Sequence, residues 1–428
     1  MTQFRLSKNL QIKNIGIELP NRVAITGLGA VTPIGLNVND TWENALIGKS
    51  GIRKIDPTWS EGLTAKIAGT IDIDPAEILG KVQARRMDRS SQLGVVAVKQ
   101  AWDDAQLPDL NKERLGVFFG TGIGGLSTVL EQYDVLNNRG PDRVNPMTVP
   151  MIMPNSAAAM VGLEVGAQAG VHSPVSACAT SAEAIAGALE MIRTNKAEVV
   201  VAGGTEACVN RLAIAAFASM KALSTRNDSP SEASRPYDIN RDGFVMSEGA
   251  GALILESEEF AKKRGAKIYG YLVGAGMSSD GYHIAAPEPE GSGAARAIQK
   301  ALSDAQINSS DISHINAHAT STPVGDIAEY KALRKSLGNE LDHVVVTATK
   351  SITGHLLGGA GAVESIFTIL SLKNSLVPPT INLEEQESSI DLKIAKNSAV
   401  ELQGKHNYAL NNSFGFGGHN VCLVFSKN

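Results

Sequence analysis

Three residues of the chain have the types and surroundings that nucleophilic and acid–base chemistry needs, and the first is a cysteine. Cys178 lies in the segment "PVSACATSAEA" (174–184), where a strand-like run gives way to a helix-forming stretch. The unpaired amides of a first helical turn carry partial positive charge and favour a thiolate. The position therefore predicts a reactive thiol as readily as a packed one. Cys208 and Cys422 lie in apolar runs, which favours packing for both.

The other two are histidines. His318 follows the strand-like "ISHINA" and opens the hydroxyl-rich loop "HATSTPVGD", and His355 lies in "TKSITGHLLGGAGAVE", five residues after Lys350 and just before a helix. Imidazole is the commonest general acid and base in proteins. Either histidine alone is interpreted equally well as a satisfied core residue. Two histidines, each joined to a glycine-rich approach, favour a site.

A third glycine-rich segment, "NNSFGFGGHN" (411–420), carries Phe414 and Phe416. Glycine weakens both helices and strands, so these glycines indicate a backbone that must bend or approach a ligand closely. A plain turn before the final strand "NVCLVF" explains the same residues. The segment is therefore a candidate part of the site.

Two familiar classes of enzyme are excluded by these motifs. Cys178 and His318 are 140 residues apart (318 minus 178), close to the spacing in papain-like proteases, but the local signature around a papain nucleophile is absent. In "TGLGAVTPIG", Thr32 stands where the third glycine of a dinucleotide-binding loop should be. Neither a cysteine protease nor a dinucleotide-binding enzyme is predicted.

The composition is that of an ordinary globular enzyme: 428 residues, 43% hydrophobic, 19% charged and a formal net charge of -5. Such a balance argues against nucleic acid as a partner. The three cysteines form no disulfide framework and show no zinc spacing with histidine, so no metal is expected. Residues 1–20 lack the apolar core of a secretory signal, and no apolar run reaches the ~18 residues of a membrane span. We expect a cytoplasmic protein with a short N-terminal extension, residues 1–20.

The elements that must position the candidate residues alternate between strands and helices, which predicts a layered α/β fold. Apolar strands such as "AEVVVAGGTEA" (197–207) are typical of a sheet covered on both faces. In the first half, the strand-like "GVHSPVSA" is followed by the cysteine and then by a helix-forming stretch. In the second half, the strand-like "HVVVTATK" is followed in the same way by a loop with a histidine and then by a helix-forming stretch. We predict two similar halves, 21–262 with the nucleophile and 263–428 with both histidines, and a site between them.

Taken together, the motifs resemble those of the β-ketoacyl-acyl carrier protein synthases of the elongating Cys-His-His type, and of the KAS II-like members in particular. The resemblance runs from "VAITGLGAVTPIG" through "VSACATS", "GGTEA", "RPYDINRDGFVMSEGAG", "NAHATSTPVGD" and "TKSITGHLLGGAGAVES" to "NNSFGFGGHN". The segments "MIMPNSAAA" and "PVSACATSAEAIA" look most like mycobacterial-type members that act on long acyl chains.

The resemblance implies a thiolase-like fold with a five-layered αβαβα core, a homodimer, and no cofactor. It implies a decarboxylating Claisen condensation in which an acyl group on Cys178 is joined to malonyl-acyl carrier protein, with release of carbon dioxide. His318 and His355 match the two histidines that assist decarboxylation. Two alternative functions remain. A thiolase would need a second catalytic cysteine in a C-terminal motif. A non-catalytic carrier-binding partner subunit would be expected to lack the nucleophile.

The resemblance also implies supporting roles. Lys350 matches a lysine that orders the site, with Glu364 as its expected partner. Phe414 matches the gating aromatic, and the amides of Cys178 and Phe414 are the expected oxyanion donors, in a loop that continues through Gly415 and Phe416. The remaining matches are Thr320 and Thr322 for pantetheine, Ile123 for the acyl pocket, and Arg85 and Arg86, in a basic stretch with Lys81 and Arg89, for docking of the acidic carrier. One residue departs from the family pattern: Ala319 stands where glycine is common, which leaves the loop geometry open.

Overall fold

The computed structural model describes residues 22–403 and 407–427, so the expected extension 1–20 lies outside the described residues. Strands of the first half lie in the order β5-β4-β6-β7-β1, and those of the second in the order β12-β10-β9-β14-β15-β8. The bounds in the first half are β1 (Val23–Val31), β4 (Leu115–Gly120), β5 (Gly170–His172), β6 (Val199–Glu206) and β7 (Gly249–Ser257). Those in the second are β8 (Gly270–Ser279), β9 (Ile312–Asn316), β10 (Val345–Thr347), β12 (Lys393–Ile394), β14 (Tyr408–Gly415) and β15 (His419–Ser426).

The two halves repeat one topology. Leaving aside the short edge strand β12, each half places its strands in the chain order third, second, fourth, fifth, first. In each half the first three positions of that order are parallel and the next strand is antiparallel to them. The halves meet where β1 pairs with β8, over the three residue pairs Val23↔Leu272, Ala24↔Tyr271 and Ile25↔Gly270. The internal repeat expected from the sequence is therefore present in the strand order.

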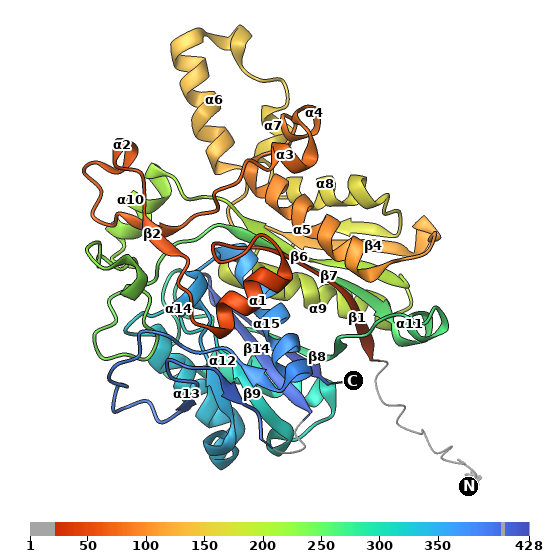
Figure 1. Cartoon of the computed structure of the whole chain (residues 1–428), viewed down its shortest axis with the longest axis vertical. Coiled ribbons are helices and arrows are strands. Elements are labelled where there is room, and N and C mark those ends of the chain that lie inside the picture. Colours follow the sequence, from red (N-terminus) through yellow and green to blue (C-terminus); the bar gives the residue numbers. More distant parts are fainter. Residues whose placement is uncertain (1–21, 404–406, 428) are drawn as a thin grey trace, which may run out of the picture.

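Helices complete five layers (Figure 1). α5 (Arg89–Ala105) and α8 (Ser156–Val165) cover the outer face of the first half, and α12 (Ser292–Ala305) with α13 (Gly325–Leu337) covers that of the second. Between the halves lie α9 (Thr180–Arg193) and α15 (Ala360–Asn374), which contact strands of both. Every residue of α15 from Ala360 to Leu372 is buried, as expected for a helix with apolar or small residues all round. The predicted layered α/β fold is confirmed.

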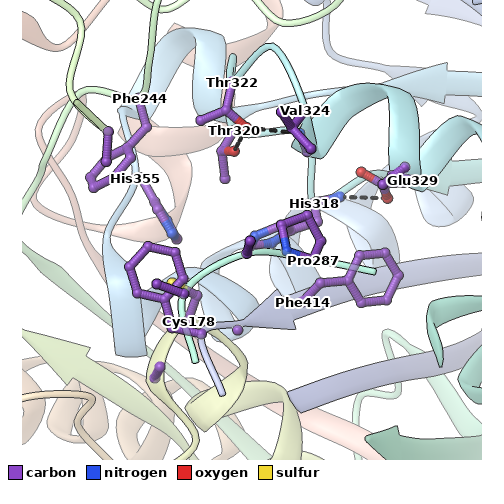
Figure 2. Close-up of a pocket in the computed structure, with 18 of the residues that line it drawn as sticks. Cys178, Phe244, Pro287, His318, Thr320, Thr322, Val324, Glu329, His355 and Phe414 are labelled. Carbon is purple, nitrogen blue, oxygen red and sulfur yellow. Dashed lines mark hydrogen bonds between the residues drawn. The ribbon is translucent and has the colours of Figure 1, made fainter. Parts of the chain in front are cut away.

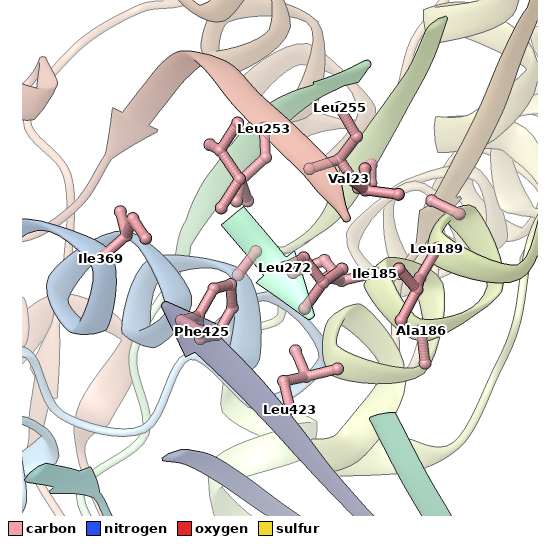
Figure 3. Packing of buried hydrophobic residues seen from close by; sticks show 14 of the residues in the cluster. Val23, Ile185, Ala186, Leu189, Leu253, Leu255, Leu272, Ile369, Leu423 and Phe425 are labelled. Carbon is pink, nitrogen blue, oxygen red and sulfur yellow. The ribbon is translucent and has the colours of Figure 1, made fainter. Parts of the chain in front are cut away.

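The central core is shared by both halves. One cluster of buried residues joins Val23 and Leu253 of the first half, Ile185 of α9, and Leu272 and Phe425 of the second half (Figure 3). Burial of a large aliphatic or aromatic side chain stabilises a fold by about 1.5–3 kcal/mol. The middle layer is therefore the part of the molecule that fixes one half against the other.

The remaining helices and strands lie around this core. They are α1 (Val38–Leu46), β2 (Ile52–Lys54), α2 (Pro57–Ser60), β3 (Ile67–Gly69), α3 (Ala76–Leu79), α4 (Lys81–Ala84), α6 (Leu126–Arg139), α7 (Thr148–Ile152), α10 (Arg211–Ser219), α11 (Glu258–Lys263), α14 (Lys350–Thr353), β11 (Leu376–Val377) and β13 (Val400–Glu401). Among the residues that the structure describes, none of the helices has the length and hydropathy to cross a membrane.

One predicted strand is shorter than expected. The run "GVHSPVSA" forms strand only over β5, which ends at His172, so Cys178 does not follow a strand directly. Pro174 lies two residues further on, and proline has no backbone N–H to donate to a strand ladder. Residues 173–176 instead lead into a 3₁₀ turn over Ala177–Ala179 that precedes α9.

Candidate active site

Cys178 occupies the middle of that 3₁₀ turn. Ala177 has a φ of 51°, a left-handed conformation that side chains other than glycine rarely adopt. The hydroxyl of Thr180 closes the turn by donating to the Ala177 carbonyl (2.8 Å) and accepting from the Ser176 N–H (2.9 Å). Backbone strain of this kind persists where the surroundings enforce it and is found at functional sites. The turn presents the sulfur to the main cavity.

That cavity has a volume of about 640 Å³ and is lined by residues of both halves. Cys178 comes from the first half, and His318 and His355 come from the second, as the sequence predicted for a site between the halves. Cys178 as a residue is partly exposed and lines this cavity. Of the other residues expected from the family, the cavity is also lined by Ile123, Thr320, Thr322, Phe414, Gly415 and Phe416.

The two imidazoles lie beside one another. Their centroids are 5.5 Å apart and their planes make an angle of 83°. Figure 2 shows both rings pointing towards Cys178. His355 also lies edge to face with Phe244, at 5.3 Å between centroids. Neither ring nitrogen of His355, nor Nδ1 of His318, has a hydrogen-bond partner among the described residues, which leaves them available to a substrate.

Both histidines are held in the neutral form. Burial, with the positive charge of Lys350, lowers the pKa of His355 well below its usual value. Burial, then Lys350 and then His355 lower the pKa of His318 in the same way. A neutral imidazole has one N–H donor and one nitrogen acceptor. The pair can therefore donate to a developing oxyanion, as the family resemblance implies.

The thiol departs from the expectation that its position favours a thiolate. Burial raises the pKa of Cys178 to about 12, and this effect exceeds the opposing ones of Lys350 and of hydrogen bonds from the backbone of Phe416 and of Cys178 itself. Backbone amides therefore do favour the thiolate, but the free-energy cost of desolvating a charged sulfur in an apolar cavity exceeds their contribution. The Cys178 thiol is therefore protonated at neutral pH.

The loop "NNSFGFGGHN" contributes a backbone amide to the site. The backbone amide of this loop that acts on the Cys178 sulfur is that of Phe416. The family resemblance concerns another role, that of the Phe414 amide as an oxyanion donor. Figure 2 shows the ring of Phe414 directed away from Cys178; its centroid lies 5.8 Å from that of His318. Gly415, between Phe414 and Phe416, has to be a glycine because a Cβ there would lie 2.5 Å from the Ser176 carbonyl oxygen. The loop packs directly on the cysteine turn.

Lys350 and Glu364 are brought together as expected. The lysine Nζ lies 2.5 Å from Oε1 of Glu364, and both side chains are almost wholly buried. Burial, partly offset by Lys350, raises the pKa of Glu364. The charge of Lys350 acts on all three candidate catalytic residues, since it lowers the pKa of Cys178, His318 and His355.

Glu329 is a residue of the site that the sequence reasoning missed. Its carboxylate accepts from the backbone N–H groups of His318 (2.9 Å) and Ala319 (2.7 Å) and from the amide of Asn412 (3.1 Å). It therefore fixes the loop that delivers His318. Ala319 fits this loop without left-handed backbone, and its Cβ packs in the core; the left-handed residue is Ser321, with a φ of 68°.

A second missed residue is Glu206, at the end of β6. Its side chain is fully buried from solvent, lines the cavity and binds the loop that carries Ile123. Glu206 is the last residue of β6 and Glu329 lies within α13, and only their tertiary contacts show that they belong to the site. Thr320 and Thr322, by contrast, lie where the sequence suggests, with their hydroxyl oxygens 3.1 Å apart on the cavity wall.

The basic stretch after α4 is only partly free. Arg85 and Arg86 are exposed. Arg89 is instead engaged by Glu248, with Nε to Oε2 at 2.9 Å and Nη2 to Oε1 at 2.8 Å, and it also donates to the carbonyls of Ile71 and Ile73. Of the arginines in this stretch, Arg85 and Arg86 therefore expose their guanidinium groups to solvent, whereas Arg89 stabilises the fold.

Comparison with known families gives two matches within the chain. The model described as "Beta-ketoacyl synthase, N-terminal domain" matches residues 20–261. The model described as "Beta-ketoacyl synthase, C-terminal domain" matches residues 269–384. Together they span more than half of the chain.

Comparison with individual proteins gives chains that are similar over nearly their whole length. "3-oxoacyl-[acyl-carrier-protein] synthase 2" of Staphylococcus aureus (strain COL) is 46% identical over 410 residues, which is 95% of this chain and 98% of that one. The protein of the same name from Synechocystis sp. (strain ATCC 27184 / PCC 6803 / Kazusa) is 44% identical over 409 residues, again 95% and 98% of the two chains.

Among solved structures, a similar chain belongs to a "type II PKS acyl-carrier protein in complex with its ketosynthase bound to the hexaketide". It aligns with a TM-score of 0.88 at 33% identity, covering 96% of this chain and all of that one. The backbone similarity therefore extends over nearly the whole of both chains.

Proposed function

The chain belongs to the β-ketoacyl synthase family, and we propose that Cys178, His318 and His355 form its catalytic centre. The protein is a 3-oxoacyl-[acyl-carrier-protein] synthase, an acyltransferase of fatty acid biosynthesis that elongates an acyl chain by two carbons. The observation that carries the assignment of residues is the convergence of one thiol and two neutral imidazoles, from opposite halves, on a single cavity.

In the first half-reaction, Cys178 attacks the carbonyl carbon of an acyl thioester on the carrier. The new carbon–sulfur bond forms, the carrier's thiolate leaves, and the proton of Cys178 passes to it through a neutral imidazole that can accept and return it. The amides of Cys178 and Phe416 lie at the sulfur and are suited to stabilise the oxyanion of the tetrahedral intermediate. Ile123 borders the acyl chain on this proposal.

In the second half-reaction, malonyl-carrier protein loses carbon dioxide as the bond between its α-carbon and carboxylate breaks. Negative charge develops on the thioester oxygen, where N–H groups of His318 and His355 stabilise it. The α-carbon then attacks the carbonyl carbon of the acyl group on Cys178. A carbon–carbon bond forms as the carbon–sulfur bond breaks, and the released thiolate takes up a proton from solvent to restore the thiol. Removal of one preorganised donor typically costs about 3–4 kcal/mol of transition-state stabilisation. Lys350 and Glu364 order these groups, and Thr320 and Thr322 hold the pantetheine arm.

The partners are part of the proposal as well. We assign the carrier-docking role to Arg85 and Arg86, whose exposed guanidinium groups suit an acidic partner. We also propose a homodimer and a cytoplasmic location, as the family resemblance implies. The edge strand β5 supports the dimer, because Val171 and the neighbouring Leu163 are exposed beside an unpaired backbone edge. The division at 262/263 into two halves is supported by the repeated strand order.

Both alternative functions lack support. A thiolase would use a second catalytic cysteine, but Cys422 lies buried in β15, paired opposite Asn412, where burial raises its pKa above the usual range. A non-catalytic partner subunit would not need the nucleophile and both imidazoles on one cavity. The family and the relatives agree with the condensing enzyme.

The experiment is to incubate the full chain with acyl-carrier proteins of graded length and then with malonyl-carrier protein. The proposal expects a mass increase of one acyl group on the peptide that carries Cys178, then release of one carbon dioxide and a 3-oxoacyl product longer by two carbons. Cys178→Ala is expected to lose the adduct and to slow condensation by more than about 10³-fold, since no second nucleophile is available. An adduct on another residue would refute the assignment, and the preferred length would test the likeness to long-chain mycobacterial-type members.

A further inference from the structure

Glu206 stands on the cavity wall with both carboxylate oxygens fully engaged. Oε1 accepts from the hydroxyl of Thr121 (2.7 Å) and the N–H of Ile123 (3.2 Å). Oε2 accepts from the N–H groups of Gly122 (2.9 Å) and Gly358 (3.1 Å). Its side chain is 0% exposed. A buried carboxylate with four donors is an unusually complete site, and none of the catalytic steps above uses it.

The four donors come from two loops in opposite halves. Thr121, Gly122 and Ile123 directly follow β4 of the first half, and Ile123 borders the cavity. Gly358 lies in a 3₁₀ turn of the second half, three residues after His355. The acyl-side loop and the histidine loop are thus held by the two oxygens of one side chain.

The two loops approach each other as closely as backbones can. A Cβ on Gly358 would lie 2.2 Å from the backbone nitrogen of Gly122, and one on Gly122 would lie 2.8 Å from Oε2 of Glu206. A Cβ on Gly122 would also lie 3.2 Å from the carbonyl oxygen of Ala177, the neighbour of Cys178. Glycine at both positions brings the two loops and the cysteine turn into contact around the carboxylate.

The segment between His355 and Gly358 transmits this position to the imidazole. At its near end, the His355 N–H donates to the Val245 carbonyl (2.8 Å) and the His355 carbonyl accepts from the Ser247 N–H (2.9 Å). At its far end, Gly358 donates to Glu206. Between them Leu357 has a left-handed backbone with a φ of 45°. With both ends fixed, a shift at Gly358 changes the backbone that carries the His355 ring.

We propose that Glu206 is a positioning residue that couples the acyl pocket to the decarboxylation site. It does so by holding the Ile123 loop and the His355 loop in a fixed position relative to each other. Acyl-chain selection and malonyl decarboxylation then both depend on it, although it contacts neither reacting atom. The inference rests on the proposed function, because it assumes that Ile123 meets the acyl chain and that His355 acts on malonyl-carrier protein.

The charge of the carboxylate is part of its role. All four partners donate, so an ionised carboxylate satisfies them, whereas a protonated acid or an amide would direct an N–H or O–H at a donor. Burial raises the pKa of Glu206, and the four hydrogen bonds oppose that effect. The substitution Glu206→Gln keeps the shape of the side chain and turns one accepting oxygen into a donor. We call this joining of the two loops by one carboxylate the clamp. The substitution therefore tests the clamp with little change in side-chain volume.

The experiment measures two quantities on the same enzyme: the acylation of Cys178 by acyl-carrier proteins of graded length, and the decarboxylation of malonyl-carrier protein. For Glu206→Gln we expect a broadened chain-length profile and decarboxylation slowed by about tenfold or more, since a displacement of about 1 Å can cost 10²-fold. Thr121→Val removes a hydroxyl that donates to Glu206 and accepts from the Gly124 N–H (3.2 Å), both on the Ile123 side. For this variant we expect an altered profile and an unchanged rate of decarboxylation.

Glu256→Gln is the matched control. Glu256 is also a fully buried glutamate, on β7, where it pairs with Arg264 (2.6 Å) away from the cavity lining. We expect this variant to lower the thermal midpoint and leave both the chain-length profile and the decarboxylation rate as in the wild type. A merely structural role for Glu206 would make its variant behave in the same way.

Each outcome decides between the inference and the proposed function. A folded Glu206→Gln enzyme with a wild-type profile and wild-type decarboxylation overturns the clamp. If that variant does not fold, Thr121→Val decides, because an unchanged profile, or equal losses in both measurements, overturns the clamp as well. A wild-type enzyme that elongates no acyl-carrier protein contradicts the proposed function and leaves the clamp no reaction to serve.

Discussion

The imidazole rings of His318 and His355 meet edge to face, with centroids 5.5 Å apart and 83° between their planes. The two rings come from different loops of the second half, and both are neutral because burial lowers the pKa of each. Rings arranged in this way can direct one N–H each at a single oxygen without opposing each other as like charges. The reaction therefore needs no proton uptake by either ring before decarboxylation begins.

The first prediction concerns these donors. His318→Ala and His355→Ala are each expected to slow malonyl decarboxylation by about 10²–10³-fold, because each removes one donor to the developing oxyanion. His355→Asn keeps an N–H donor and should retain more of the rate than His355→Ala. The measurement is carbon dioxide release from malonyl-carrier protein. His172→Ala, whose ring stacks on Phe118 away from the cavity lining, is the control. Equal rates for wild type and both alanine variants would contradict the role of the imidazoles.

The second prediction follows from the pKa of about 12 that burial gives the Cys178 thiol. Since only the thiolate is alkylated, the rate of modification by iodoacetamide should rise about tenfold per pH unit between pH 7 and pH 10. The rate is followed by the mass of the peptide that carries Cys178, with Cys178→Ala defining the background from other thiols. A plateau below about pH 9 would show that the thiol ionises earlier and that burial does not dominate.

The third prediction concerns the buried pair Lys350–Glu364, joined at 2.5 Å. Lys350→Met leaves a carboxylate without its counterion and is expected to lower the free energy of unfolding by on the order of 3 kcal/mol. It also removes the positive charge that lowers the pKa of Cys178, so alkylation at any given pH should slow.

The double variant Lys350→Met with Glu364→Gln separates these two effects. Stability should return in part, because no unpaired charge remains buried, while alkylation of Cys178 should stay slow. Chemical unfolding and the alkylation rate are measured on the same samples. Recovery of the alkylation rate along with stability would mean that Lys350 acts on the thiol through packing and not through its charge.

The fourth prediction is a loss of stability in mild acid. His314 is buried on β9 with Nδ1 3.0 Å from the Val345 carbonyl oxygen, and burial lowers its pKa to about 4. Between that value and about 6.5 the unfolded chain binds a proton that the folded chain does not, so stability falls as the pH is lowered. This residue alone should contribute about 2 kcal/mol between pH 7 and pH 5.

His318 and His355 act in the same direction, because burial lowers the pKa of both. Urea unfolding at pH 7 and at pH 5 gives the total change for the wild type. His314→Gln should reduce that change by about 2 kcal/mol. The same change in the variant as in the wild type would show that His314 takes up its proton in the folded state.

The sequence predicted the layered fold, and the candidate residues that it singled out from both halves line one cavity in the structure. The order of glycine-rich motifs located Cys178, His318 and His355, and the alternation of strands and helices predicted the layers. Electrostatics was the weaker part. Position alone suggested a thiolate at Cys178, but the pKa depends on how much apolar surface surrounds the sulfur, which no local pattern contains.

Contacts between loops were also beyond local patterns. The loop "NNSFGFGGHN" contains two phenylalanines that the sequence alone does not distinguish. Only the packing of this loop on the cysteine turn identifies the backbone amide of Phe416 as the one at the Cys178 sulfur. Glu206 lies in the motif "GGTEA" and Glu329 in the helix that follows "NAHATSTPVGD", but neither segment indicates which groups the carboxylate binds. Their hydrogen bonds reach residues that lie from 10 to 152 positions away in the chain. Distance along the chain hides such partners from any reading of neighbouring residues.

The narrow seam of three residue pairs between β1 and β8 has a consequence for dissecting the molecule. Backbone pairing contributes little to the union of the halves, so a chain cut between them should still assemble if both fragments are made in the same cell. A fragment made alone would instead expose the apolar side chains of α9 or α15 that the other half normally covers, and we expect it to precipitate. Such fragments would be useful as partners that report on each other's presence only by becoming active together.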